Sequence, residues 1–90
     1  MAVVWIPSLL RGLTGGLDKV AVPGSTLRQV IRALGEQYPD LTERLLDEEG
    51  SIQPDLAVAI DGETSHLGLL EKVREDSEIH FIPAIGGGSA

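Results

Sequence analysis

Cysteine is absent from this sequence, and aromatic residues make up only 3% of its 90 positions. Without a thiol the chain has no disulfide framework, no thiolate metal site, and no side chain that could carry a persulfide or act as a sulfur nucleophile. Its two histidines are too few for an imidazole-based zinc site. We therefore expect an aliphatic core of Leu, Val, Ile and Ala, with no bound metal or cofactor.

Basic residues are also scarce, seven against fourteen acidic ones, which gives a formal charge of −7. This charge repels nucleic acid phosphates and anionic membrane surfaces, so we expect neither as a partner and expect protein partners to present basic faces. The apolar run 2–6 is too short to span a membrane, and no basic stretch precedes it. A cytoplasmic protein with one small domain is the resulting expectation.

One helix is strongly indicated. Thr26 is a suitable N-cap, and Gln29 three residues later completes a capping box. Pro39 should end the helix near Tyr38. Apolar residues recur at helical spacing between these limits, at Leu27, Val30, Ile31 and Leu34.

Alternating apolar residues predict the strands, which we place at 2–7, 17–22, 56–60 and 78–82, with a short edge strand at 64–66. The glycine-containing segment 8–16 should connect the first two strands as a hairpin loop, and Asp61-Gly62 is a strong turn pair. Helical turns are expected within 41–46 and 67–73. Two strands, a helix and further strands predict an α+β chain of the β-grasp, or ubiquitin-like, type, with a mixed four- to five-stranded sheet packed on one main helix.

The final stretch is Pro83-Ala84-Ile85-Gly86-Gly87-Gly88-Ser89-Ala90. Its glycines cannot pack a core, and they order only at a high entropic cost. We therefore divide the chain into a β-grasp domain over 1–83 and a flexible tail over 84–90. A tail without Cβ atoms is thin enough to enter a narrow active site of another protein, and residues 84–88 reach roughly 16 Å when extended. A frayed terminus without function is the other interpretation.

The order of these elements and several short motifs resemble ubiquitin-like sulfur carriers of the ThiS/MoaD family, especially those of cysteine biosynthesis. The likeness covers nearly the whole chain. Its motifs are Ile6-Pro7-Ser8-Leu9-Leu10-Arg11, Thr14-Gly15-Gly16, Gly24-Ser25-Thr26-Leu27, Glu43-Arg44-Leu45-Leu46-Asp47 and the Pro83-Ala84-Ile85-Gly-Gly ending.

The resemblance implies a protein substrate rather than an enzyme. In that family an E1-like enzyme of the ThiF/MoeB type uses ATP to adenylate the terminal glycine carboxylate, and a sulfur donor converts the acyl-adenylate to a thiocarboxylate. The sulfur then passes to an acceptor, such as a PLP-dependent cysteine synthase. Here the matching glycine is Gly88, with Gly86 and Gly87 threading into partner active sites beside it.

Ser89 and Ala90 depart from the family pattern, in which mature chains end at Gly-Gly. While they remain attached, the Gly88 carbonyl is an amide and cannot be adenylated. The resemblance implies that a JAMM-type zinc metalloprotease removes them. Cleavage after Gly87, and a Ser-Ala remnant without biological meaning, stay open.

Trp5, His80 and Ile82 should face outward from the sheet, and if the first and last strands pair they could form a docking patch beside the tail. Isolated surface exposure is the other interpretation. A ubiquitin-like modifier or binding module, conjugated to lysines through the same glycine, is the alternative function. No paired-carboxylate pocket, nucleophile–base set or phosphate loop indicates an enzyme. The sulfur acceptor and the oligomeric state are not predicted.

Overall fold

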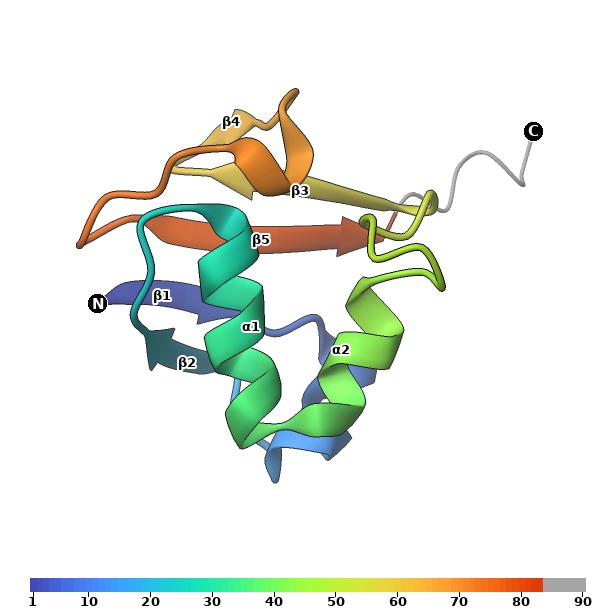
Figure 1. Cartoon of the computed structure of the whole chain (residues 1–90). Helices are drawn as coiled ribbons and strands as arrows, with labels where there is room; N and C mark the ends of the chain where they lie inside the picture. Colours follow the sequence, from blue (N-terminus) through green and yellow to red (C-terminus); the bar gives the residue numbers. More distant parts are fainter. Residues whose placement is uncertain (84–90) are drawn as a thin grey trace.

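The computed structural model describes residues 1–83, and the predicted tail over 84–90 lies outside this range. Five strands alternate with helical segments along the chain (Figure 1). The strands are β1 (Ala2–Trp5), β2 (Lys19–Val22), β3 (Leu56–Ile60), β4 (Glu63–Thr64) and β5 (Glu78–Pro83). The helices are α1 (Leu27–Gln37) and α2 (Pro39–Leu45), with the 3-10 segments η1 (Ser8–Thr14) and η2 (Gly68–Leu70).

The strands form one mixed sheet in the order β2-β1-β5-β3-β4. β1 and β5, the first and last strands of the chain, pair in parallel at its centre, with Val4 opposite Ile79. The other neighbours are antiparallel, β1 with β2 and β5 with β3. This arrangement confirms the predicted β-grasp fold.

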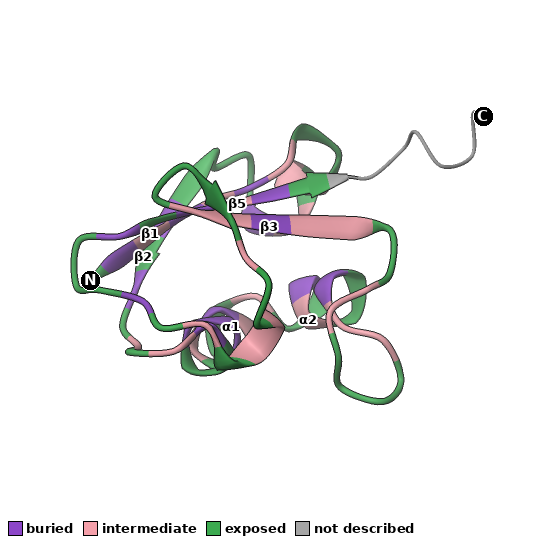
Figure 2. Ribbon diagram, turned by 90° about the horizontal axis from the view of Figure 1, so that it is seen from above, coloured by how far each residue is buried: buried purple, intermediate pink, exposed green. Residues whose placement is uncertain are grey.

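Both α-helices lie on one face of the sheet, and no helix within residues 1–83 covers the other (Figures 1 and 2). The helical stripe and the inward strand residues meet in the layer between them, because the apolar spacing matches the period of each element. Fully buried members from both layers include Val4, Val22, Leu27, Leu34 and Ile79. The core is aliphatic apart from Phe81, as the composition requires.

The start of α1 shows why Gly24, Thr26 and Leu27 stand together. Gly24 has φ +149, and a Cβ there would lie 2.8 Å from the backbone nitrogen of Val30. Thr26 Oγ1 accepts the Gln29 N–H at 3.3 Å, which confirms the predicted N-cap. The Gln29 side chain, however, accepts from the N–H of Ser25 at 2.8 Å, one residue before the position that a capping box predicts.

The connection between β1 and β2 differs from the predicted hairpin loop, because most of it is the 3-10 helix η1. The Thr14 hydroxyl lies 3.0 Å from the carbonyl oxygen of Arg11 and 2.9 Å from that of Leu17. β2 begins at Lys19 rather than at the predicted residue 17. The predicted edge strand at 64–66 is likewise displaced, and β4 occupies Glu63–Thr64.

Candidate functional site

The carboxyl end of β5 leads from the body into the tail. β5 pairs with β1 at residues 78–80 and with β3 at residues 79–83, so its last three residues are held by β3 and Pro83 lies opposite Leu56. A strand anchored within a sheet gives a defined starting point to the chain that follows it. The predicted tail residues Gly86, Gly87, Gly88, Ser89 and Ala90 lie outside the described residues, so the structure does not test their roles.

The sheet face opposite the helices is made by the strand residues that alternate with the buried ones, and we call it the open face. Its members are Val3, Trp5, Lys19, Ala21, Ala57, Ala59, Thr64, Glu78, His80 and Ile82. Six of these ten side chains are apolar, and those of β1 and β3 are half-buried. The face is therefore largely apolar beside the end of β5.

Trp5 lies on the open face between two neighbours. Its ring stacks on that of His80, with centroids 5.5 Å apart and an interplanar angle of 5°. On the other flank the Lys19 ammonium lies 5.2 Å from the centre of the indole. The strand register explains both contacts, because Trp5 lies opposite Lys19 on β2 and opposite His80 on β5.

The indole N–H of Trp5 donates to Glu78 Oε1 at 3.0 Å, and this bond fixes the ring in its plane. We call Lys19, Trp5 and His80 the aromatic stack. The structure thus brings together Trp5 and His80, two members of the predicted patch. The sequence analysis missed Lys19, although its place in an alternating strand could have signalled that it faces outward.

Ile82, the third predicted member, also lies on the open face and is 48% exposed. It pairs with Ala57 of β3 and follows His80 on the same side of β5. Two residues along a strand span about 7 Å, so Ile82 continues the patch toward the tail. All three predicted docking residues therefore share one surface, while a role in binding remains a prediction.

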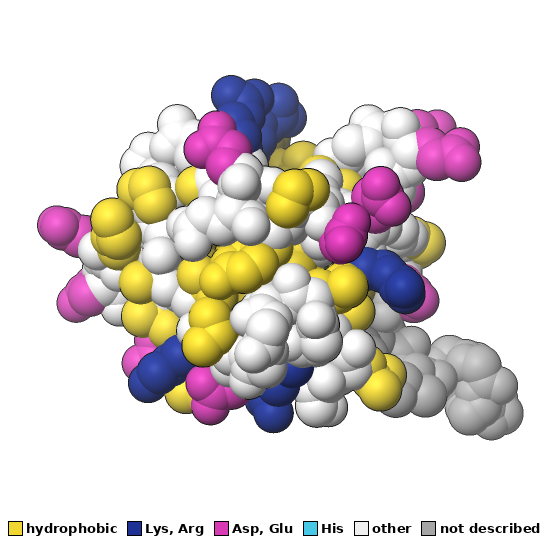
Figure 3. Space-filling view, turned by 90° about the horizontal axis from the view of Figure 1, so that it is seen from below, with side chains coloured by type: hydrophobic (Ala, Val, Ile, Leu, Met, Phe, Trp, Pro, Cys, Tyr) yellow, Lys and Arg dark blue, Asp and Glu magenta, His cyan; other side chains and the backbone are white. Residues whose placement is uncertain are grey.

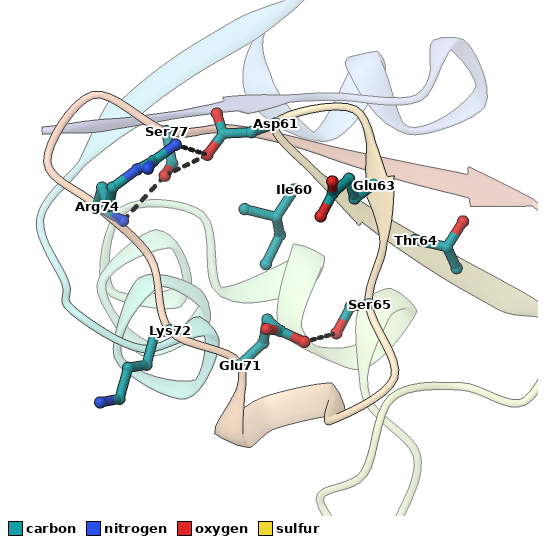
Figure 4. A pocket seen from close by; sticks show the side chains of 9 residues that line it. All are labelled: Ile60, Asp61, Glu63, Thr64, Ser65, Glu71, Lys72, Arg74 and Ser77. Carbon is teal, nitrogen blue, oxygen red and sulfur yellow. Dashed lines mark hydrogen bonds and ion pairs between the residues drawn. The ribbon is translucent and has the colours of Figure 1, made fainter.

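A polar pocket of about 420 Å³ opens at the other end of β5, near the β3–β4 turn (Figure 4). The Ser77 hydroxyl and the Arg74 guanidinium both contact Asp61 Oδ2, at 2.8 and 3.4 Å. On the opposite wall Ser65 donates to Glu71 at 2.8 Å. These groups largely satisfy one another, and the pocket opens at the end of β5 that is distant from the tail.

Asp61 holds the beginning of β5 against the hairpin. Its Oδ1 accepts the Glu78 N–H at 2.9 Å, and its own N–H donates to the Glu78 carbonyl oxygen at 2.9 Å. The Glu78 N–H and then the Ser77 hydroxyl lower the pKa of Asp61 from its ordinary value; burial opposes them, and the nearby Arg74 adds a lesser lowering. We assign this cluster to stability rather than to chemistry.

Hydrophobic side chains also gather on the underside of the molecule, in the middle of the view in Figure 3. That side holds η1 and β2 in Figure 1, and the segment between β1 and β2 includes Leu9 and Leu17, which are 87% and 47% exposed. A further hollow of about 430 Å³ lies between α1 and α2, with Ile31, Leu46 and Leu69 on its walls. The hollow shares no lining residue with the aromatic stack.

Within residues 1–83 no group of histidine and acidic side chains has an arrangement that could hold a metal ion. In the same part of the chain no helix is long and apolar enough to cross a membrane.

The fold and its site define the class of protein, a ubiquitin-like β-grasp domain whose central strand leads into a glycine-rich tail. The model of the ThiS family matches residues 4–88, and the chain belongs to that family. A curated relative, the sulfur carrier protein CysO of Mycobacterium tuberculosis, is 32% identical over 89 residues, covering 94% of this chain and 96% of the relative.

Solved structures agree with this assignment. The crystal structure of M. tuberculosis CysO has a TM-score of 0.88 at 29% identity, and the match covers 94% of this chain and all of the CysO chain. A chain of the Amycolatopsis orientalis BexX/CysO complex matches with a TM-score of 0.88 at 26% identity, covering 94% and 97% of the two chains. The modifier protein SAMP1 of Haloferax volcanii, at 23% identity and TM-score 0.75 over 97% and 98%, shares the fold.

Proposed function

We propose that this chain is a sulfur carrier that works through a thiocarboxylate on Gly88. The observation that carries the proposal is the extent of the family match, which runs through the β-grasp body to Gly88 and leaves Ser89 and Ala90 outside it. The curated CysO relatives, named as sulfur carrier proteins, are matched over nearly their whole length. A chain without cysteine that carries sulfur needs a backbone carboxylate to hold it.

The chemistry begins with hydrolysis of the Gly88–Ser89 amide by a JAMM-type metalloprotease, which frees the glycine carboxylate. A carboxylate oxygen then attacks the α-phosphate of ATP on an E1-like, ThiF/MoeB-type enzyme, and pyrophosphate leaves. Sulfide from the donor attacks the acyl carbon of the adenylate and displaces AMP. The product is the Gly88 thiocarboxylate, whose sulfur is nucleophilic and can attack an electrophilic acceptor.

In this proposal the body supplies position rather than catalysis. β5 is fixed by β1 in its first half and by β3 up to Pro83, so the residue from which the tail starts is held in a defined place relative to the open face. A partner that docks on Trp5, His80 and Ile82 therefore meets the tail at a constant distance. Gly86 and Gly87 let the backbone pass through a narrow entrance because they have no side chains.

The partners are the enzymes that load and unload the tail. The structure of CysO with BexX from A. orientalis supports a protein partner for a chain of this shape. By analogy with the cysteine-biosynthesis relatives, the proposed acceptor is an activated serine bound to a PLP-dependent cysteine synthase. The proposal requires ATP and a sulfur donor at the activating enzyme and no cofactor on this chain.

Intact-mass spectrometry tests the proposal. The full chain is incubated with its metalloprotease, its activating enzyme, ATP and sulfide. The expected result is loss of Ser89-Ala90, followed by the replacement of one oxygen with one sulfur. Omission of ATP should leave the chain trimmed but without sulfur. A trimmed chain that acquires no sulfur in the complete mixture would count against the proposal.

The same assay separates sulfur transfer from conjugation. If the chain is instead a protein modifier, incubation in cell extract should give a ladder of heavier species joined through Gly88 to lysine side chains. A single band together with a thiocarboxylate supports the carrier function. Trypsin digestion of any heavier band would identify the glycine–lysine linkage and contradict a carrier-only role.

A further inference from the structure

The open face differs in charge from the chain as a whole. The full sequence has a formal charge of −7. The outward register positions that form the open face carry one lysine, Lys19, and one acidic residue, Glu78, so their formal charges cancel. The acidic excess therefore comes from other positions, and a protein approaching the open face meets a neutral, mostly apolar surface.

The two charged groups on this face differ in whether they already have a polar or ionic partner. Glu78 already accepts the indole N–H of Trp5 at 3.0 Å. The Lys19 ammonium rests against the indole at 5.2 Å, and no carboxylate within residues 1–83 forms an ion pair with it. Contact with an aromatic ring limits the freedom of a lysine side chain without neutralising its charge. Lys19 is thus a positioned cation whose charge remains available to a partner.

The Trp5 ring has a neighbouring side chain on each side, and the strand pairing of the sheet sets the positions of all three residues. Lys19, Trp5 and His80 come from three adjacent strands and lie opposite one another in the register. Binding of a partner to these residues therefore costs less side-chain entropy than binding to freely moving surface groups would. His80 lies three residues before Pro83, about 10 Å along β5, so a protein seated on the stack also lies beside the origin of the tail.

We infer that the aromatic stack determines which partner docks, and that the partner surface is apolar with a carboxylate placed against Lys19. The occupant to which we commit is the adenylating enzyme, so the inference rests on the proposed function. It revises the expectation from net charge that partners present a basic face. Charge complementarity at the open face calls for an acidic group, because the one carboxylate on this face is engaged with the indole.

A pair of charge reversals tests this inference. The chain has two lysines, Lys19 and Lys72, and both are exposed. Lys72 lines the polar pocket and lies outside the open face. Lys19→Glu and Lys72→Glu make the same change in net charge, from −7 to −9, at different places. Calorimetric titration of each full-length chain into the ThiF/MoeB-type enzyme, without ATP or sulfide, measures docking alone.

We expect Lys19→Glu to weaken binding about tenfold and Lys72→Glu to change it by less than about twofold, because an attraction becomes a repulsion at the first site only. Lys19→Gln removes the charge without reversing it and should give a smaller loss. Raising the salt concentration should weaken parent binding more than that of Lys19→Gln. Equal thermal unfolding temperatures for the variants confirm that the fold is intact.

Three results would overturn the inference: unchanged or tighter binding by Lys19→Glu, equal weakening by both reversals, or no measurable docking of the parent chain. Because the titration contains no ATP, its outcome is independent of sulfur loading. If Gly88 is loaded with sulfur while Lys19→Glu binds like the parent, the docking inference fails alone. If no sulfur is loaded but Lys19→Glu alone binds weakly, the sulfur-carrier function fails and the docking surface stands.

Discussion

Individual side chains in this protein fall into two groups with different tasks. Asp61 and Ser77 satisfy each other and the backbone at the beginning of β5, with Ser77 only 1% exposed. Trp5 and Lys19 stand on the open face, where their contacts position them without burying them. The first group uses its polar atoms within the fold, and the second leaves the Lys19 charge available to a partner.

Asp61 should make stability depend on pH. Its carboxylate has a lowered pKa in the folded chain, so its contribution is fully present above the unfolded value near 3.8 and is lost as pH falls through the folded pKa. Asn tolerates the positive φ of 54° at this position. We therefore expect Asp61→Asn to lower the thermal midpoint by a few degrees at pH 7 and progressively less below pH 4.

Thermal melts of both chains across this pH range check the prediction. A difference between Asp61→Asn and the parent that stayed constant down to the lowest pH would contradict it. Such a result would mean that the carboxylate charge contributes nothing and that only the shape of the side chain matters.

At the scale of elements, the turn into α1 carries a constraint that the helix pattern alone does not show. Gly24 adopts a backbone angle that L-residues rarely accept, and its Cα faces the first turn of the helix. Thr26 caps that turn, and the Leu27 side chain is fully buried below it. The Gly-x-Thr-Leu motif is therefore a structural unit that sets where the helix begins over the sheet.

We expect Gly24→Ala to lower the free energy of unfolding by about 1–3 kcal/mol, because the new Cβ would lie 2.8 Å from both the backbone nitrogen and a methyl group of Val30. Gly12→Ala is the matched control. Gly12 lies in η1, and a Cβ there meets nothing within 4 Å. Denaturant unfolding of both variants measures the difference. Equal midpoints for the two variants would show that the helix start can relax at no cost.

In the molecule as a whole, the residues that stabilise the fold and the residues proposed to carry out the chemistry occupy different parts of the sequence. The buried hydrophobic core of the described chain extends from Ala2 to Phe81, and the glycine residues that the proposed function uses follow it in sequence. The body can therefore be complete without them.

Deletion of Gly87 and Gly88 should leave the thermal midpoint within about 1 °C of the parent, because every buried hydrophobic residue of the described chain precedes them in sequence. The same variant should gain no sulfur in the complete loading mixture. Differential scanning calorimetry and intact-mass spectrometry provide the two readings. Sulfur loading by the deleted chain would rule out Gly88 as the site, and a large fall in the midpoint would show that these glycines support the fold.

The sequence by itself determined the elements and the direction of most side chains. Alternation in the strands placed Ile79 and Phe81 inward and His80 and Ile82 outward, and the stripe on α1 identified its buried face, because side-chain direction follows the local backbone period. The extent of η1 was not predicted, since glycines at 12, 15 and 16 suggested a loop. In the structure the Thr14 hydroxyl contacts one carbonyl oxygen before it, that of Arg11, and one after it, that of Leu17, at the end of the 3-10 helix.

Only the tertiary structure decided which outward residues meet. Trp5 and Glu78, which form a hydrogen bond, are 73 positions apart in the sequence. Lys19, from a third strand, contacts the Trp5 ring. No local pattern fixes the register between strands so distant in sequence, because that register depends on how all the core side chains pack together. The tail motif could be read directly from the chain, whereas the aromatic stack exists only once β1 is paired with both β2 and β5.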